Sequence, residues 1–265
     1  MTPIKTILKG PVFYVALALL VFVLFFYGYS KLPPIVKNQG ALNGMYSGSG
    51  QPSLSPSSSP IPTSTTHKPT ISASPTISSS KVINVPFTVQ APYGIWDKLH
   101  NEACEEASIL MADAWITGRA TLPQDYAEQE IQKLTQWGLD HYNSYDTSAA
   151  QTAKMAEAVY SIKSRLIKNP TVVNIKQEID QGHIVIMGMS GQMLDNPYFK
   201  SPGPIYHMLV IKGYDATGFV VNDSGTRHGE GFHYSYDNLM QSAHDWPGSA
   251  EGLNQSPAVA MVFSK

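Results

Sequence analysis

Cysteine is nearly absent from the sequence, and acidic residues are absent from its first 81 positions. Cys104 is the single cysteine among 265 residues, so an intramolecular disulfide and a cysteine-based zinc cluster are excluded. Residues 1–81 contain six lysines but no arginine, aspartate or glutamate. The rest of the chain therefore holds 12 basic against 20 acidic residues, a formal net charge of −8. This charge repels nucleic acid, which we do not expect as a partner, and favours neutral or cationic ligands.

Charge is also missing from residues 11–30, which read PVFYVALALLVFVLFFYGYS. At ~1.5 Å per helical residue such a run reaches ~30 Å, enough to cross the hydrocarbon core of a bilayer. We predict a transmembrane signal anchor here, behind a short basic N-terminus at residues 1–10. A cleavable signal peptide is the alternative, but the run exceeds the usual ~7–15 residues and no small-residue cleavage site follows it. Two lysines flank the run on each side, so the positive-inside rule leaves its orientation nearly balanced.

The following segment is poor in large apolar residues. Residues 51–80 contain 11 Ser, 5 Thr and 6 Pro, a composition that cannot bury enough apolar surface to fold. We therefore predict a disordered linker over residues 31–80. A tether of this kind suits a domain held beyond a membrane surface, and we expect a single-pass cell-membrane protein whose C-terminal domain is extracytoplasmic.

Residues 81–265 provide enough chain for one globular domain. The apolar spacing predicts helices first and mainly strands afterwards, which indicates an α+β fold with the N-terminal helices packed on an antiparallel sheet. The 17 residues between Ser190 and Tyr206 are rich in Gly, Pro and Asn, and we expect them to form a loop that covers a site. The expected helices are 103–117, from 123 onward, 148–160 with Asp146 and Thr147 as cap candidates, 172–181 and 236–245. The expected strands are 82–89, 183–189, 207–214, 219–223 and 258–264.

Cys104 falls in the first turn of the predicted helix EACEEASILMADAWITG. Helix N-termini lower the pKa of a thiol because their unpaired N–H groups favour negative charge. Glu105 and Glu106 would raise that pKa if they pointed toward the sulfur, but at ~100° per residue we expect them to face away from it. A buried cysteine that packs as a small apolar residue is the alternative to a nucleophile.

A nucleophilic cysteine needs a histidine base and a group that orients it. The stretch YHMLVIKGYDATGFVVND places His207 at the start of one predicted strand and Asp223 at the end of the next, so antiparallel pairing brings the two together. A histidine at a sheet rim and a turn-forming aspartate are the alternative interpretation. Six other histidines have surface, packing or edge interpretations: His67, His100, His141, His183, His228 and His233. His244 with Asp245 near a helix end is a possible pair, although the two side chains diverge at adjacent positions.

The oxyanion of a tetrahedral intermediate needs a hydrogen-bond donor. Gln90 ends the first predicted strand and could offer its side-chain N–H beside the backbone N–H of Cys104.

These residues carry a resemblance to a known family. The order Gln, Cys opening a helix, His opening a strand and Asp on the next strand resembles the papain-like cysteine peptidases, and within them the bacteriocin-processing, double-glycine-leader peptidases. The motifs are VPFTVQAP, ACEEASILMA, YHMLVIKGYD and VVNDSGT. The resemblance implies Cys104 as nucleophile, His207 as base, Asp223 as orienting acid and Gln90 as oxyanion donor. Many members have CGP where this chain has CEE, and DP where it has DS.

We therefore expect a membrane-tethered cysteine peptidase that acts on peptide or protein substrates and needs no metal or organic cofactor. Two alternatives stay open. The same order of residues serves acyl transferases and cell-wall peptide amidases. An inactive module could instead bind peptide or cell wall through aromatic residues such as Trp96, Tyr206 and Trp246.

Overall fold

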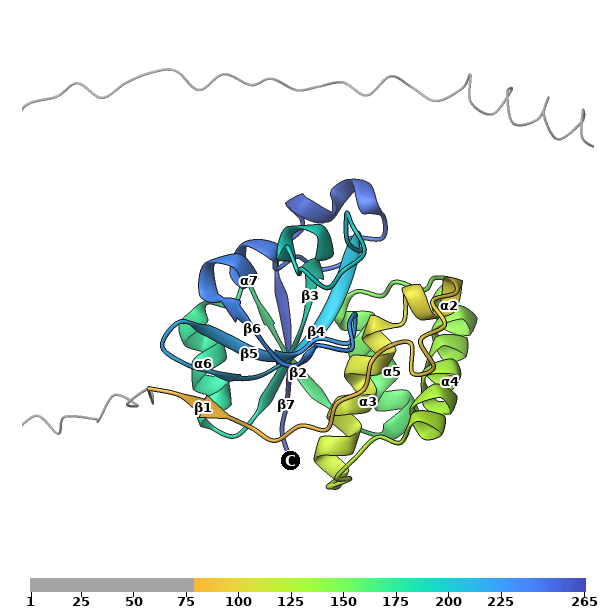
Figure 1. Cartoon of the computed structure of the whole chain (residues 1–265), viewed down its shortest axis with the longest axis horizontal. Helices are drawn as coiled ribbons and strands as arrows, with labels where there is room; N and C mark the ends of the chain where they lie inside the picture. Colours follow the sequence, from red (N-terminus) through yellow and green to blue (C-terminus); the bar gives the residue numbers. More distant parts are fainter. Residues whose placement is uncertain (1–78) are drawn as a thin grey trace, which may run out of the picture. The chain divides into compact units, whose positions relative to one another are not determined.

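The computed structural model describes residues 79–265. The predicted basic N-terminus and transmembrane anchor, and nearly all of the predicted linker, lie outside the described residues. Among the helices of residues 79–265, none is long and apolar enough to span a bilayer. The described residues combine helices with an antiparallel sheet, as the order of elements predicted (Figure 1).

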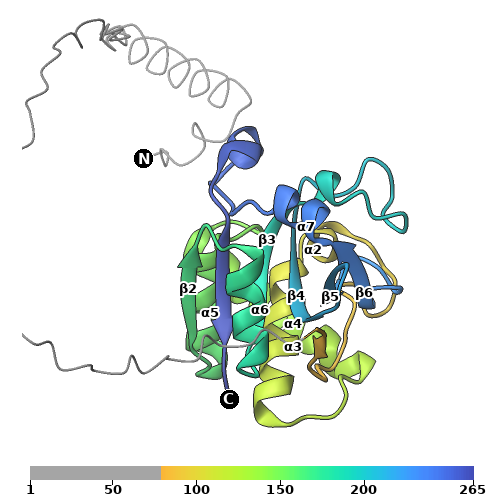
Figure 2. The same ribbon diagram turned by 90° about the vertical axis from the view of Figure 1, so that its left-hand side faces the viewer.

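The sheet is antiparallel throughout, and its main path follows the order β2, β7, β3, β4, β5, β6, with β1 paired to β4. Figure 2 shows these strands side by side across the domain. The central strands β3 and β4 are buried along their whole length, so they can be apolar on both faces. The strands are β1 (Lys81–Val82), β2 (Ser164–Lys168), β3 (Ile184–Ser190), β4 (Tyr206–Tyr214), β5 (Gly218–Asn222), β6 (Glu230–Ser235) and β7 (Val259–Phe263).

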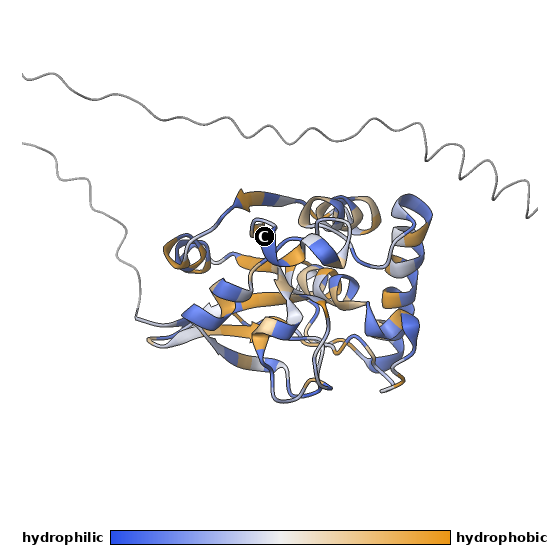
Figure 3. Ribbon diagram, turned by 90° about the horizontal axis from the view of Figure 1, so that it is seen from above, coloured by the Kyte–Doolittle hydropathy of each residue, from blue (hydrophilic) through white to orange (hydrophobic). Residues whose placement is uncertain are grey.

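Helices cover both faces of the sheet. On one face α3 and α5 pack on the strands through alternate residues such as Ile186, Met208 and Met261. On the other face α6 and α7 pack on the neighbouring positions, such as Met187 and Leu209. In Figure 3 the strands are mostly orange and the surrounding helices carry blue segments, in line with this apolar centre. The helices are α2 (Lys98–Asn101), α3 (Cys104–Thr117), α4 (Gln124–Tyr142), α5 (Ala149–Tyr160), α6 (Val172–Asp180) and α7 (Tyr236–Ser242), with 3-10 turns at Gly191–Leu194 and Ala250–Gln255.

Local sequence signals explain most helix boundaries. Gly118 ends α3 in the left-handed conformation at φ 75°, as its position after the apolar pattern predicted. Ser148 begins α5 through a capping box with Gln151, so the prediction of Asp146 or Thr147 as the cap was wrong. The Ser148 hydroxyl accepts from the free amide of Gln151, and the Thr147 amide donates to Glu105 instead.

The first predicted strand is the main difference in the sheet. Only Lys81 and Val82 pair as β1, and residues 83–89 run on without strand pairing. The Ile83 amide still donates to the carbonyl of Lys212 at 2.8 Å, and further along the segment the side-chain amide of Asn222 donates to the carbonyl of Val85 at 3.1 Å. The sequence pattern also missed α2 and β2, which are short and mostly exposed and therefore lack a long apolar period.

Candidate active site

Cys104 is the first residue of α3 and its side chain is 3% exposed. The opening amides of a helix have no partner within the helix, so they present N–H groups near the sulfur. The predicted helix-start position of the thiol is thus what the structure shows.

α3 packs against β4. Four residues after Cys104, the Ser108 hydroxyl donates to the Cys104 carbonyl at 2.7 Å and lies 3.4 Å from the carbonyl of Met208 on β4. A second connection runs through Thr147. The Tyr206 hydroxyl donates to the carbonyl of Thr147 at 3.3 Å, and the Thr147 amide donates to the Glu105 carboxyl. The start of α3 is therefore joined to the start of β4, the strand that carries His207, through Glu105, Thr147 and Tyr206.

His207 and Asp223 form the buried pair that the hairpin pattern predicted. His207 Nε2 lies 2.8 Å from Asp223 Oδ1, and the two side chains are 1% and 0% exposed. A carboxylate that accepts from Nε2 fixes the neutral tautomer in which Nδ1 carries the lone pair. His207 can therefore accept a proton at Nδ1.

Three further donors hold the Asp223 carboxylate. The Tyr234 hydroxyl and the Asn196 amide donate to Oδ2 at 2.7 and 3.1 Å, and the Gly225 amide donates to Oδ1 at 3.0 Å. Burial alone would raise the pKa of Asp223. The charge of His207 and the hydrogen bonds from His207, Tyr234 and Gly225 outweigh this effect and hold the pKa below its usual value. The acid is thus kept ionised and fixed in orientation.

The loop between β3 and β4 contributes to this arrangement, as predicted for residues 190–206. Besides Asn196, it supplies Phe199, whose ring meets the imidazole of His207 edge-on at 5.3 Å between centroids. Gly225 lies beside both rings, since a Cβ there would come within 2.8 Å of Phe199 and 3.0 Å of the His207 ring. The imidazole is therefore confined by Phe199 and the backbone of Gly225.

The thiol of Cys104 donates to a carboxylate. Its Sγ lies 3.0 Å from Glu105 Oε2, while the amide of Thr147 donates to Glu105 Oε1 at 2.7 Å. The expectation that Glu105 faces away from the sulfur was wrong, because the long side chain turns back to satisfy the buried Thr147 amide. Within the described residues, no hydrogen bond joins Cys104 to His207.

Several acidic groups surround this thiol and favour its neutral form. Burial raises the pKa of Cys104 well above its usual value, and the charge and hydrogen bond of Glu105 raise it further. Burial also raises the pKa of Glu105 well above normal, that of Glu106 to about 8 and that of Asp146 to about 7. Oε2 of Glu106 is buried without a hydrogen-bond partner. These directions agree with carboxyls that retain protons near neutral pH, so the resting thiol is not a free thiolate.

Gln90 is buried beside the start of α3, but its amide is already engaged. Nε2 donates to the carbonyls of His100 and Asn101 at 2.9 and 3.0 Å. Its backbone amide donates to the carbonyl of Ser224 at 2.9 Å, next to Asp223. Gln90 thus connects the approach to α3 with the loop after β5, and one amide hydrogen would have to leave its carbonyl to serve an oxyanion.

Two other predicted positions differ in the structure. His100, expected on the surface, is buried and bonds Asp97 and Glu128 through its two ring nitrogens at 2.8 and 3.0 Å. Tyr206, considered as a ligand-binding aromatic, is buried in the core against Trp246. Trp96 remains exposed. Over residues 79–265, no group of three or more His, Cys, Asp or Glu side chains is placed to hold a metal ion.

Sequence reasoning missed four contacts of this site: Asn196, Tyr234, Glu105 and Thr147. The contact of Tyr234 could have been predicted from the sequence. Side chains alternate between the two faces of a strand, so every second residue of the strand that follows Asp223 is on the same face of the sheet. The Thr147 contact had none, because it is 42 residues from Glu105 in the chain.

The described residues form a mixed helical and antiparallel-sheet domain of the papain-like class. The chain belongs to the Peptidase_C39-like family, whose model matches residues 82–251. Eight chains of solved structures match, among them a C39-like peptidase from Bacillus anthracis with 15% identity, a TM-score of 0.47 and coverage of 70% of this chain and 98% of that chain. No curated protein matches the sequence.

Proposed function

We propose that the protein is a membrane-tethered cysteine peptidase that hydrolyses peptide bonds with Cys104 as nucleophile, His207 as base and Asp223 as orienting acid. The observation that carries this proposal is the buried hydrogen bond between Asp223 and His207 on β4, the strand that packs against α3, which begins at Cys104. Membership of a peptidase family supports peptide substrates.

The reaction would begin when the Cys104 thiol transfers its proton to Nδ1 of His207 and the sulfur attacks the substrate carbonyl carbon. His207 then gives that proton to the leaving amine, and an acyl group stays on the sulfur. Water, deprotonated by His207, releases the carboxylic acid and restores the thiol. Because the resting thiol donates to Glu105, it must first turn from that carboxyl toward His207.

The amide of Gln90 and the backbone N–H of Cys104 are the proposed oxyanion donors. In this step one Gln90 hydrogen leaves the carbonyl of His100 or Asn101 and turns to the intermediate. Gln90→Ala would then lower kcat much more than it raises KM. If Gln90 only stabilises the loop, Gln90→Ala would instead lower the unfolding midpoint and leave kcat little changed.

The experiment for the activity uses the full-length chain in detergent with a quenched-fluorescent peptide library. Wild type should cleave peptides, Cys104→Ser and His207→Ala should lose at least about 10³-fold in rate, and the exposed His141→Ala should be unchanged. Cleavage that persists in Cys104→Ser would contradict the assignment.

A non-catalytic peptide-binding domain is the second candidate, and the hydrogen bond from the Cys104 thiol to Glu105 favours it. In that case peptides bind wild type and Cys104→Ser equally, and no peptide is cut. Linkage of an added amine to the peptide, in place of hydrolysis, would identify an acyl transferase.

The membrane anchor at residues 11–30 and the extracytoplasmic position of the domain are part of the proposal. They rest on the uncharged run in the sequence. Added protease should digest the domain on intact cells stripped of their wall, and a domain protected until lysis would overturn the orientation.

A further inference from the structure

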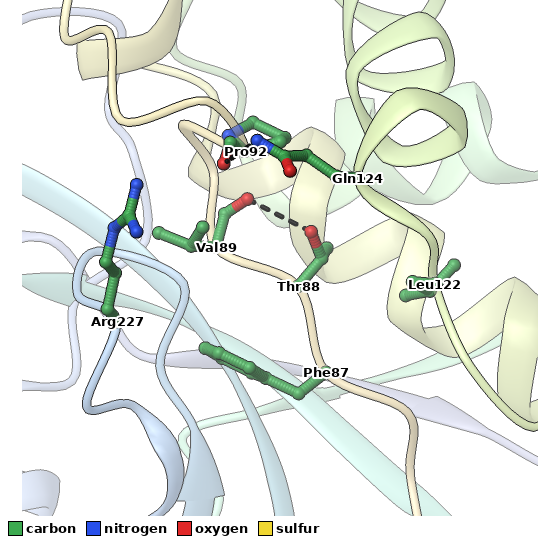
Figure 4. A pocket seen from close by; sticks show the side chains of 7 residues that line it. All are labelled: Phe87, Thr88, Val89, Pro92, Leu122, Gln124 and Arg227. Atoms are coloured by element: carbon green, nitrogen blue, oxygen red, sulfur yellow. Dashed lines mark hydrogen bonds between the residues drawn. The ribbon is translucent and has the colours of Figure 1, made fainter.

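A pocket of about 330 Å³ lies beside the segment that carries Gln90. In Figure 4, Arg227 stands on one side of it and Leu122 and Gln124 on the other, with the chain from Phe87 to Pro92 passing between them. Its lining is mostly apolar, through Phe87, Val89, Pro92 and Leu122. A volume of this size suits one or two amino-acid residues or a small molecule.

Arg227 is an unpaired cation at this pocket. Of the three arginines in the chain, Arg165 pairs with Glu178 at 2.8 Å and Arg119 lies over the ring of Tyr126. Arg227 is exposed and makes no ion pair or hydrogen bond with the described residues. In residues 82–265, where acidic side chains outnumber basic ones by 20 to 12, an arginine without a carboxylate partner is available for an external anion.

The guanidinium of Arg227 lies close to Gly94. Gly94 has a left-handed φ of 71°, and a Cβ at this residue would collide with Nη2 of Arg227. The guanidinium therefore packs against the backbone two residues beyond Pro92, the end of the chain segment that lines the pocket.

Both walls of the pocket continue into the candidate active site. Val89 immediately precedes Gln90, and Arg227 follows Asp223 by four residues. The two walls are joined by the hydrogen bond from the Gln90 amide to the Ser224 carbonyl at 2.9 Å and by a second from the Ser224 hydroxyl to Gln90 Oε1 at 3.3 Å. A ligand in the pocket is thus within a few residues' reach of the proposed catalytic groups.

We propose that this pocket binds the C-terminal end of a peptide substrate, with Arg227 on the free α-carboxylate and the apolar lining around the last side chain. The inference rests on the proposed peptidase activity and adds to it a substrate class: peptides cut close to a free C-terminus. A guanidinium binds a carboxylate through two parallel hydrogen bonds, which a terminal amide cannot match.

A chain end fits this pocket better than an internal segment. The side-chain amide of Gln124, the first residue of α4, donates to the carbonyl of Pro92 at 3.0 Å and so joins the helix to the opposite wall. The small volume of this open pocket and the cation beside it favour a short occupant that ends in a carboxylate.

The test uses full-length protein in detergent and two N-acetylated hexapeptide libraries that differ only in a free or amidated C-terminus. For wild type, kcat/KM should be at least about tenfold higher with the free acid, through a lower KM. Arg227→Gln should lower kcat/KM for the free acid to the value for the amide, and Arg227→Lys should keep part of the preference. Lys168→Gln, which removes the same charge from β2 at the opposite edge of the sheet, should behave as wild type.

Calorimetry with a Cys104→Ala chain separates this inference from the proposed activity. Binding of the free acid that depends on Arg227, without cleavage by wild type, would support the pocket and overturn the peptidase. Cleavage without preference for the free acid, or a preference that survives Arg227→Gln, would overturn the pocket and leave the peptidase standing.

Discussion

The chemistry of Cys104 is decided by its nearest acidic neighbour. Glu105 accepts from the thiol and from the Thr147 amide at once, so the carboxyl that shapes the loop before α5 also holds the thiol proton. A helix N-terminus alone would favour the thiolate, but burial and this carboxyl oppose it. We infer that proton transfer to His207 occurs only when substrate displaces the thiol from Glu105.

Glu105→Gln should lower the pKa of Cys104, because the amide oxygen still accepts from Thr147 while the side-chain NH2 can face the sulfur, where it donates to a thiolate in place of a carboxyl oxygen that accepts the thiol proton. Each unit by which the pKa falls raises the thiolate fraction at neutral pH about tenfold. Iodoacetamide should therefore alkylate the variant about tenfold or more faster than wild type at pH 7. The exposed Glu157→Gln is the control, and an unchanged rate in Glu105→Gln would show that Glu105 does not hold the proton.

Tyr234→Phe should move the acid side of the pH profile. The hydroxyl donates to Asp223 Oδ2 at 2.7 Å and helps to hold the pKa of Asp223 low. Without it that pKa rises, so His207 loses its ionised partner at a higher pH as the solution is acidified. The measurement is kcat/KM from pH 4 to 9, in which the acid limb should shift to higher pH. A uniform loss of rate with the limb unmoved would indicate a purely structural role.

At the level of elements, the loop after β5 decides whether the histidine is held. Gly225→Ala would place a Cβ within 3.0 Å of the His207 ring and 2.8 Å of Phe199. The ring must move, so kcat should fall by about tenfold or more while the unfolding midpoint changes little. Phe199→Leu in the same chain should restore part of the rate, and the absence of any loss in Gly225→Ala would contradict the confinement of His207.

Long helices with a regular apolar pattern were predicted better from the sequence than features held by contacts between residues far apart in the chain. The apolar face of α3 and the stop at Gly118 are local signals, and both were confirmed. The pairing of His207 with Asp223 followed from a short hairpin and was also found. The engagement of Gln90 and the turn of Glu105 toward the sulfur depend on carbonyls and amides brought close only by folding, so no local pattern could reveal them.

For the whole molecule, the buried carboxyls make stability depend on pH. Glu106 and Asp146 hold protons to about pH 8 and 7 in the folded chain, against usual values of 4.5 and 3.8. At a pH between the usual pKa of each carboxyl and its pKa in the folded chain, the folded state binds more protons than the unfolded state. The free energy of unfolding therefore falls as pH rises through this range. The fall is at most about 1.4 kcal/mol per pH unit for each proton.

Denaturant unfolding followed by tryptophan fluorescence from pH 5 to 9 measures this slope, since all four tryptophans lie in residues 79–265. Glu106→Gln should flatten the curve and raise stability above pH 8, because an amide has no proton to lose. Glu157→Gln should follow wild type. Stability that rises from pH 5 to 8 in wild type would show that the carboxyls are ionised in the folded state.

The central claim, that Cys104 attacks substrate with His207 as its base, is tested most directly by trapping the acyl group on the sulfur. Full-length protein mixed with cleavable peptide is quenched in acid and its intact mass is measured within the first turnover. We predict an adduct of one peptide acyl group on Cys104 in wild type and its loss in His207→Ala. Peptide cleavage without any adduct on Cys104, or an equal adduct in His207→Ala, would contradict the account.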